Sequence, residues 1–315
     1  MDKNCKLSKE NKNMPTLLAL RDITKQYANT LAVNHVSLEI PRQSIFGLLG
    51  PNGAGKTSLI RIITQITVAD SGEILFDGEK LRSEHTSQIG YMPEERGLYK
   101  RMRVGEQLLY LAQLKGLSAV AARKKIGELF ERFSMENWWK KKVEELSKGM
   151  QQKVQFIATI LHEPKLLILD EPFTGLDPIN ADLITEEIHR LRDNGATIIF
   201  STHRMEQVEE LCDNIALINH GKKILEGKVI DIRQQFKKQE FSIRFAGMWK
   251  LVPPEWLHVK ESHSGEVIVN VSQGKLPNDI LRAVINDGIQ IVGFNELLPS
   301  IHDIFISLVK GDEHA

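Results

Sequence analysis

The chain has 315 residues and carries 41 basic and 41 acidic side chains, so no net charge favours nucleic acid as a partner. Hydrophobic residues make up 42% and charged residues 26%, a globular composition that excludes a disordered or fibrous chain. No apolar run approaches the ~18 residues of a spanning helix, and the two cysteines lack the spacing of metal ligands.

The N-terminal part of the chain predicts a tail followed by strands and a glycine-rich turn. Residues 1–15 are polar and rich in Lys and Asn, which indicates a disordered tail rather than a secretory signal. Strand-like stretches follow at 17–23 and 31–40. A short apolar run at 45–49 then enters a glycine-rich turn, and a helix is predicted at 56–66.

The middle of the chain alternates between strand and helix patterns. A strand at 72–78 ends in turn residues, and a helical pattern fills 104–145 between two strand-rich regions. Continuous apolar runs at 166–169 and 197–200 are typical of strands buried on both faces of a parallel sheet. An amphipathic helix at 180–194 separates them.

The pattern changes after residue 227. Residues 241–245 and 267–271 alternate as half-buried strands, and residues 276–286 and 301–309 predict helices. We therefore expect residues 227–315 to form a separate α+β domain without phosphate-binding features.

Residues 50–57 read Gly-Pro-Asn-Gly-Ala-Gly-Lys-Thr and fit the phosphate-loop pattern G-x-x-x-x-G-K-[ST]. Glycines let backbone N–H groups converge on a phosphate, and the following helix adds its N-terminal dipole. Lys56 is expected to reach the β- and γ-phosphates, and the Thr57 hydroxyl to ligate Mg²⁺. The predicted nucleotide-binding residues here are Gly50, Pro51, Asn52, Gly53, Ala54, Gly55, Lys56, Thr57 and Ser58.

Two carboxylates, Asp170 and Glu171, follow the buried strand at 166–169. Ligands of α/β sheets bind at the carboxyl ends of strands. We expect Asp170 to hold Mg²⁺, directly or through water, and Glu171 to polarise an attacking water as general base.

At this point the sequence resembles the ATP-binding-cassette (ABC) ATPases. The resemblance covers about residues 17–226 and rests on five motifs in the order of the family. They are the phosphate loop at 50–57, a signature segment at 146–150, the acidic strand at 166–171, a D-loop at 174–178 and a histidine after a strand, His203. The resemblance implies an α/β phosphate-loop domain at 16–226, with a helical insert at about 98–148.

The family's ATPase domains pair head to tail, so each ATP lies between the phosphate loop of one chain and the signature segment of another. The resemblance therefore implies that Ser147 and Gly149 contact the γ-phosphate in trans, and that Asp177 links the two sites. His203 is implied to contact the γ-phosphate in cis and help to orient water. Tyr27 occupies the place of the aromatic residue that stacks on adenine.

The sequence departs from the family pattern at three positions. The signature segment has Lys148 and Met150 where the family favours Gly and Gln, while Ser147 and Gly149 are retained. Glu94 stands where the family usually has the glutamine that ligates Mg²⁺. Because a carboxylate is also a hard oxygen donor, we predict that Glu94 still lies at the metal, directly or through water.

The stretch at 91–99 and the ending at 298–305 resemble a bacterial export subgroup that includes sodium-efflux ATPase subunits and self-resistance drug exporters. This implies the ATP-hydrolysing subunit of a membrane exporter. Its partners would be a permease on a separate chain and a second copy of itself or a paralogous ATPase subunit. It would be cytoplasmic and peripheral, held at the cytoplasmic face of the membrane by its permease.

Two alternatives remain. One is a soluble ABC ATPase that acts on ribosomes or DNA, but such members usually carry two cassettes or a long coiled-coil insert. The other is a nucleotide-sensing scaffold without catalysis, which the presence of Lys56, Asp170, Glu171 and His203 disfavours. In the family, specificity for the transported substrate lies in the permease. The C-terminal domain is expected to be an appendage without catalysis, which stabilises the dimer or regulates it.

Overall fold

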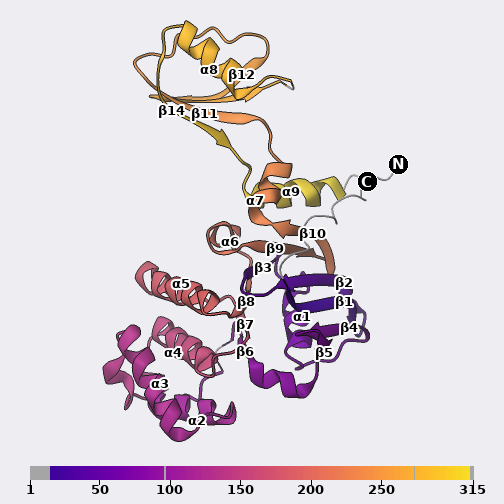
Figure 1. Ribbon diagram of the computed structural model, residues 1–315, viewed down its shortest axis with the longest axis vertical. Coiled ribbons are helices and arrows are strands. Elements are labelled where there is room, and N and C mark those ends of the chain that lie inside the picture. Colours follow the sequence, from indigo (N-terminus) through magenta and orange to yellow (C-terminus); the bar gives the residue numbers. More distant parts are fainter. Residues whose placement is uncertain (1–14, 96, 273, 313–315) are drawn as a thin grey trace. The chain divides into compact units, whose positions relative to one another are not determined.

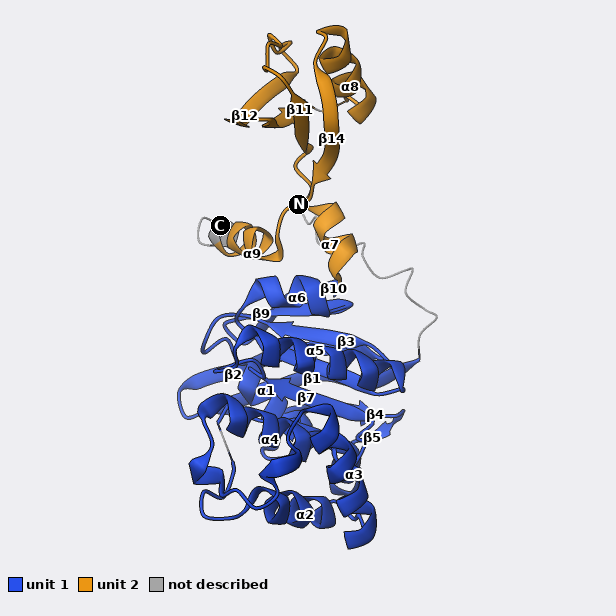
Figure 2. Ribbon diagram, turned by 90° about the vertical axis from the view of Figure 1, so that its left-hand side faces the viewer, with its two compact units in different colours: residues 1–227 blue, residues 228–315 orange. Residues whose placement is uncertain are grey.

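The computed structural model describes residues 15–95, 97–272 and 274–312. Apart from Pro15, the predicted disordered tail lies outside the described residues. The chain divides into two compact units, Met1–Gly227 and Lys228–Ala315, which are described separately below (Figure 2).

A four-stranded antiparallel sheet forms one part of the first unit. Its order is β2-β1-β4-β5, with bounds β1 Thr16–Tyr27, β2 Thr30–Pro41, β4 Ser71–Phe76 and β5 Glu79–Lys80. Apolar side chains that alternate along β1 and β2, such as Leu18, Leu20 and Ile40, are buried in the core of the unit.

A six-stranded sheet of order β10-β9-β3-β8-β7-β6 forms the centre of the unit (Figure 1). The bounds are β3 Ile45–Leu49, β6 Ile89–Met92, β7 Leu166–Asp170, β8 Thr197–Thr202, β9 Asn214–Asn219 and β10 Lys222–Lys228. β3 pairs with β8 and β9, and β7 pairs with β6 and β8, all in parallel. Every residue of β3, β7 and β8 is buried, as the continuous apolar runs at 166–169 and 197–200 predicted for β7 and β8. The carboxyl ends of these strands therefore meet at one edge of the sheet.

Four helices connect the strands of this sheet or cover it: α1 Lys56–Ile63, α4 Lys148–Ile160, α5 Pro178–Asp193 and α6 Met205–Leu211. α1 ends before the predicted residue, Ile66. The Thr64 hydroxyl donates to the Ile60 carbonyl, and Gln65 adopts a left-handed φ of 59°, which stops the helix. Ile66 is consequently 62% exposed.

The helical insert runs from α2 to α4 (Figure 1). Its elements are α2 Val104–Leu114, α3 Ala119–Arg132, and the short 3₁₀ helices η2 Glu136–Trp138 and η3 Val143–Glu145. Ser118 caps α3 by accepting from the Ala121 N–H at 3.2 Å. The Trp139 indole packs so close to Gly105 that a Cβ there would lie 2.3 Å from the ring.

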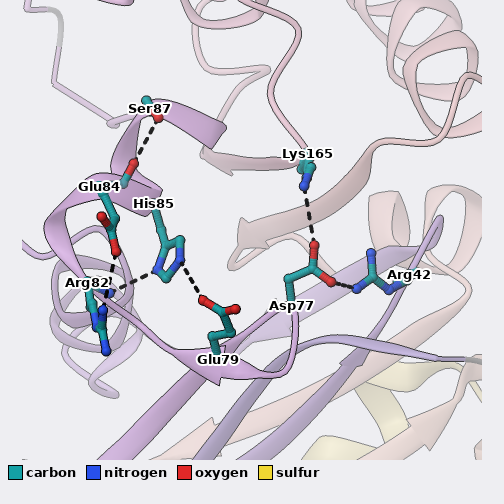
Figure 3. Close-up of polar contacts among 8 residues, drawn as sticks. All are labelled: Arg42, Asp77, Glu79, Arg82, Glu84, His85, Ser87 and Lys165. Atoms are coloured by element: carbon teal, nitrogen blue, oxygen red, sulfur yellow. Dashed lines mark hydrogen bonds and ion pairs between the residues drawn. The ribbon is translucent and has the colours of Figure 1, made fainter.

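Polar contacts tie the antiparallel sheet to the segments that lead into β6 and β7 (Figure 3). Asp77, in the turn after β4, pairs with Arg42 and with Lys165, the latter at 3.3 Å and directly before β7. The 3₁₀ helix η1, Ser83–Gln88, precedes β6. Its buried His85 accepts from the Arg82 N–H at 3.0 Å through Nδ1, and its Nε2 lies 3.9 Å from the carboxylate of Glu79 in β5. The start of both strands is therefore anchored at the sheet edge away from their carboxyl ends.

The second unit is a four-stranded antiparallel sheet with helices. The sheet order is β12-β13-β11-β14, and the bounds are α7 Val229–Gln235, β11 Glu240–Ala246, β12 Leu257–His263, β13 Glu266–Val271, α8 Pro277–Asn286, β14 Gln290–Leu297 and α9 Ile301–Asp312. Its core gathers Ile243, Val269 and Ile280 from β11, β13 and α8. No helix within the described ranges is long and apolar enough to cross a membrane.

Candidate active site

The loop between β3 and α1 is folded around the side chain of Lys56. Lys56 is only 7% exposed, and its Nζ donates to the carbonyls of Gly50 at 2.7 Å and Pro51 at 3.0 Å. The Ala54 N–H also donates to the Pro51 carbonyl at 3.1 Å. The backbone of the loop therefore positions the ammonium group inside the loop.

Two glycines of the loop are required by close backbone packing. Gly50 has a φ of 147°, and a Cβ there would lie 2.1 Å from the Ile218 carbonyl oxygen. Gly55 has a φ of 108°, and its Cβ would lie 2.2 Å from the Ala32 carbonyl oxygen. The loop backbone packs directly against the end of β9 and the start of β2. A side chain is therefore sterically forbidden at both glycine positions.

A cavity of about 400 Å³ opens beside the loop and brings predicted residues from three segments together. Residues 52–58 line it with Glu94, Asp170 and Glu171. Glu94 follows β6, and the other two carboxylates lie where β7 ends, so strand ends at one sheet edge supply the acidic side. Gly50 and Pro51 do not line this cavity, but they accept the hydrogen bonds from Lys56.

Burial shifts the pKa values of two charged groups in the cavity in the direction of their neutral forms. It lowers the pKa of Lys56, against the raising effect of the nearby carboxylates of Glu171, Asp170 and Glu94. Burial also raises the pKa of Asp170, and the charges of Glu171 and Glu94 raise it further. Additional positive charge in the cavity would stabilise the ionised carboxylates.

The cavity has the donor set of a magnesium site. The Thr57 hydroxyl and the carboxylates of Asp170 and Glu94 line it, and all are hard oxygen donors. Among the described residues, its lining contains one ammonium group, that of Lys56, against three carboxylates, so these residues carry an excess of negative charge. In the described part of the chain, no three His, Cys, Asp or Glu side chains form a complete metal site by themselves. The described residues therefore suit a cation that is held by one or two carboxylates together with substrate phosphates.

The two predicted catalytic residues, Glu171 and His203, are in direct contact. The Glu171 carboxylate accepts from the Thr202 hydroxyl at 3.1 Å and from the His203 N–H at 2.8 Å. The His203 Nδ1 lies 2.6 Å from the same oxygen of Glu171. His203 is about half exposed, whereas Glu171 is 8% exposed. The end of β8 and the residue that follows it thus hold the carboxylate of Glu171, the residue directly after β7.

The signature segment caps the exposed start of α4. Ser147 is the N-cap residue, and its hydroxyl accepts from the Met150 N–H at 3.3 Å. A Cβ at Gly149 would lie 3.0 Å from the Gly175 carbonyl oxygen, so the helix start packs against the D-loop backbone. Neither Ser147 nor Gly149 is among the described residues that line the cavity.

Asp177 and Tyr27 lie outside the described cavity lining as well. Asp177 is the N-cap of α5, and hydrogen bonds from the Asn180 N–H and side-chain amide lower its pKa. Tyr27 ends β1 and is 41% exposed, with the Lys25 ammonium 5.5 Å from its ring centroid.

Some residues of the site carry no signal in the sequence. Residues 30–32, His220 and Gly221 line the cavity from β2 and the turn between β9 and β10. Gln152 of α4 donates to the Pro172 carbonyl at 3.0 Å and so holds the chain after Glu171. In the sequence, the role of Gln152 is indicated only by an amide side chain within a helix that has a large apolar face.

Comparison with known proteins identifies the family. Residues 33–174 match the ABC transporter family, and residues 227–309 match the family described as "ATP-binding protein DrrA1-3-like, C-terminal domain". A solved structure described as the ATP-binding subunit of an ABC transporter shares 32% identity with a TM-score of 0.66, over 70% of this chain and 93% of that one. The expected fold, an α/β phosphate-loop ATPase domain followed by a small α+β domain, is confirmed.

Two relatives extend the match. An uncharacterized ABC transporter ATP-binding protein of Bacillus subtilis, YhaQ, is 42% identical over 295 residues, which cover 93% of this chain and 98% of the relative. The Nod factor export ATP-binding protein I of Cupriavidus pinatubonensis is 36% identical over 70% of this chain and 68% of its own length. The phosphate loop, the acidic strand end and the length of these matches lead to one conclusion: the chain belongs to the ABC transporter family and is one of its ATP-binding proteins, an ATPase.

Proposed function

We propose that this ATPase is the energising subunit of an exporter, which binds Mg-ATP between two copies of the chain and drives a permease on a separate polypeptide. The observation that carries the proposal is the cavity in which Lys56, Thr57, Glu94, Asp170 and Glu171 converge. These groups supply a phosphate-binding cation, metal-binding oxygens and a carboxylate base in one place.

In this proposal Thr57, Asp170 and Glu94 would hold Mg²⁺, directly or through water, and the ion would supply positive charge to the phosphates. Lys56 contacts the β- and γ-phosphates when it leaves the carbonyls of its own loop. The glycine-rich backbone and the N-terminus of α1 bind the remaining phosphate oxygens. The exposed ring of Tyr27 stacks on the adenine.

Glu171 is the general base and accepts a proton from the attacking water at its carboxylate. Because the carboxylate oxygens of Glu171 contact Thr202 and His203, one of them must be released for this role. His203 then contacts the γ-phosphate and orients the water.

The other half of the site comes from a second copy of the chain. Ser147 and Lys148 are exposed at the start of α4, where backbone N–H groups and the helix dipole favour an anion. Ser147 and Gly149 therefore contact the γ-phosphate of the partner in trans. Asp177 lies on the neighbouring D-loop, where it links the two sites across the interface.

A groove of about 490 Å³ supports a permease partner. It lies between the insert and the sheet, and Ile66, Leu98, Leu111 and Leu114 line it with other residues. Ile66 and Leu114 are each more than 60% exposed and both line this one groove, so apolar side chains are grouped there on a surface that a partner can cover. We propose that a cytoplasmic helix of the permease docks here and holds the protein at the cytoplasmic face of the membrane. The name of the Nod factor export relative supports the export direction.

The partner can be tested by purifying the tagged chain from membranes. We expect a co-purifying polypeptide with spanning helices, identified by mass spectrometry, that is lost when Leu114→Arg places a charge in the groove. Val120→Arg is the matched control, because Val120 is 81% exposed on α3 and does not line the groove. A chain that recovers ribosomes and no membrane polypeptide contradicts the proposal.

A further inference from the structure

Gln155 of α4 binds the backbone on both sides of the predicted metal ligand Glu94. Its side chain is 5% exposed, and Nε2 donates to the Pro93 carbonyl at 2.9 Å and to the Glu95 carbonyl at 3.3 Å. Only the NH₂ end of a glutamine can donate to carbonyls, so the amide orientation is fixed by its partners. Its Oε1 has no hydrogen-bond partner among the described residues.

The Glu94 side chain enters the nucleotide cavity from the segment that Gln155 holds. Glu94 lines the cavity with Asp170 and Glu171, and its charge raises the pKa of Asp170. Since both neighbouring carbonyls are bound to a single amide group, the direction of the Glu94 side chain depends on where α4 presents Gln155. The two segments are 60 or more residues apart in sequence, so this hydrogen bonding is tertiary.

The same helix holds the segment with the proposed base. Gln152 lies three residues before Gln155, on the same side of the helix, and donates to the Pro172 carbonyl next to Glu171. α4 therefore contacts both segments that supply carboxylates to the cavity. Its N-cap, Ser147, is the residue proposed to contact ATP in the second copy.

We propose that Gln155 is a positioning residue that sets the affinity of the site for Mg²⁺ by holding Glu94 through the carbonyls of Pro93 and Glu95. The inference rests on the proposed function, in which Glu94 is a metal ligand. Gln155 also lines the groove proposed for the permease, so one side chain contacts both that groove and the segment with Glu94.

The test uses Gln155→Leu, which keeps the side-chain volume and removes the donor, in the full chain. We measure the Mg²⁺ concentration for half-maximal ATP hydrolysis, and ATP binding in EDTA. We expect the Mg²⁺ requirement to rise about tenfold, as for the loss of a buried hydrogen-bond pair, with metal-free ATP binding nearly unchanged. Gln155→Met is the second variant if the first does not fold.

The matched control is Gln107→Leu. Gln107 is a fully buried glutamine of α2, and both amide atoms lack a hydrogen-bond partner among the described residues. It lies outside the described linings of the cavity and the groove, so its replacement should leave the Mg²⁺ requirement unchanged. A general effect of removing a buried amide would shift both variants equally and would overturn the inference.

Glu94→Ala separates the inference from the proposed function. If Gln155 acts through Glu94, the Glu94→Ala chain has a raised Mg²⁺ requirement that Gln155→Leu does not raise further. A shift in Glu94→Ala without one in Gln155→Leu overturns the inference and leaves the metal assignment intact. No shift in Glu94→Ala removes Glu94 from the metal and overturns both. Additive shifts in the double variant also overturn the inference, because Gln155 would then act elsewhere.

Discussion

Replacing Glu171 by glutamine removes the proposed base and changes little else. The glutamine side chain has the shape of the glutamate, and its amide oxygen can still accept from the His203 N–H. In the parent chain that nitrogen lies 2.8 Å from the Glu171 carboxylate. The new amide group can donate to the Thr202 hydroxyl, which donates to the carboxylate at 3.1 Å in the parent chain. We therefore expect the free energy of unfolding to fall by less than about 2 kcal/mol.

Catalysis should respond much more strongly than stability. A positioned general base contributes about 100- to 10,000-fold, which is roughly 2.7–5.4 kcal/mol of the activation barrier. Turnover of the Glu171→Gln chain at saturating Mg-ATP should fall by that factor, while ATP binding is retained. Phosphate release, equilibrium binding of a fluorescent ATP analogue and thermal unfolding measure the three quantities separately.

Glu128→Gln is the control for loss of a carboxylate. Glu128 is exposed on α3 and its closest cation, the Lys124 ammonium, is 3.9 Å away, so its replacement should change none of the three measurements. A folded Glu171→Gln chain with turnover within about threefold of the parent would refute Glu171 as the base.

Three further changes test the loop and the insert. Lys56→Ala removes the buried ammonium that binds the loop carbonyls, and it should weaken ATP binding more than tenfold in an equilibrium titration, roughly the loss of a charge-assisted contact; unchanged affinity contradicts the assigned contact. Gly50→Ala places a Cβ 2.1 Å from the Ile218 oxygen, so the free energy of unfolding should fall by roughly 1–3 kcal/mol in thermal unfolding, and nucleotide binding should be lost. A parent-like melting temperature refutes the packing argument. Ser118→Ala removes the cap of α3 and should cost about 1 kcal/mol in denaturant unfolding without changing turnover; an altered turnover contradicts a purely structural role.

The phosphate loop and the acidic strand end could be predicted because their signals are local. Gly50 and Lys56 lie within one short pattern, and Asp170 directly follows a continuous apolar strand. Short apolar runs likewise predicted β3, β7 and β8. In each case a few adjacent residues determine the backbone conformation and the chemistry together.

The remaining features depend on tertiary contacts that no local pattern encodes. β12 was not predicted, because all its residues after Leu257 are exposed and a register shift interrupts its pairing, so it has no alternating pattern. Residues 30–32 contribute to the cavity by position alone. Gln155 reads as an ordinary polar helix residue until its partners Pro93 and Glu95, far away in the sequence, are known.

The central claim is that the cavity is half of an active site and that a second copy of the chain completes it through Ser147. The measurement is sedimentation velocity of Glu171→Gln, with and without Mg-ATP, alone and combined with Ser147→Arg. Ser118→Arg in the same background controls for the loss of an N-cap serine, because Ser118 is also exposed at the start of a helix.

The account predicts a dimer for Glu171→Gln and for its combination with Ser118→Arg, formed only when Mg-ATP is present. The combination with Ser147→Arg should bind ATP and remain a monomer, because the arginine blocks the contact in trans. An ATP-bound Glu171→Gln chain that stays monomeric, or a Ser147→Arg combination that dimerises equally well, would contradict the claim.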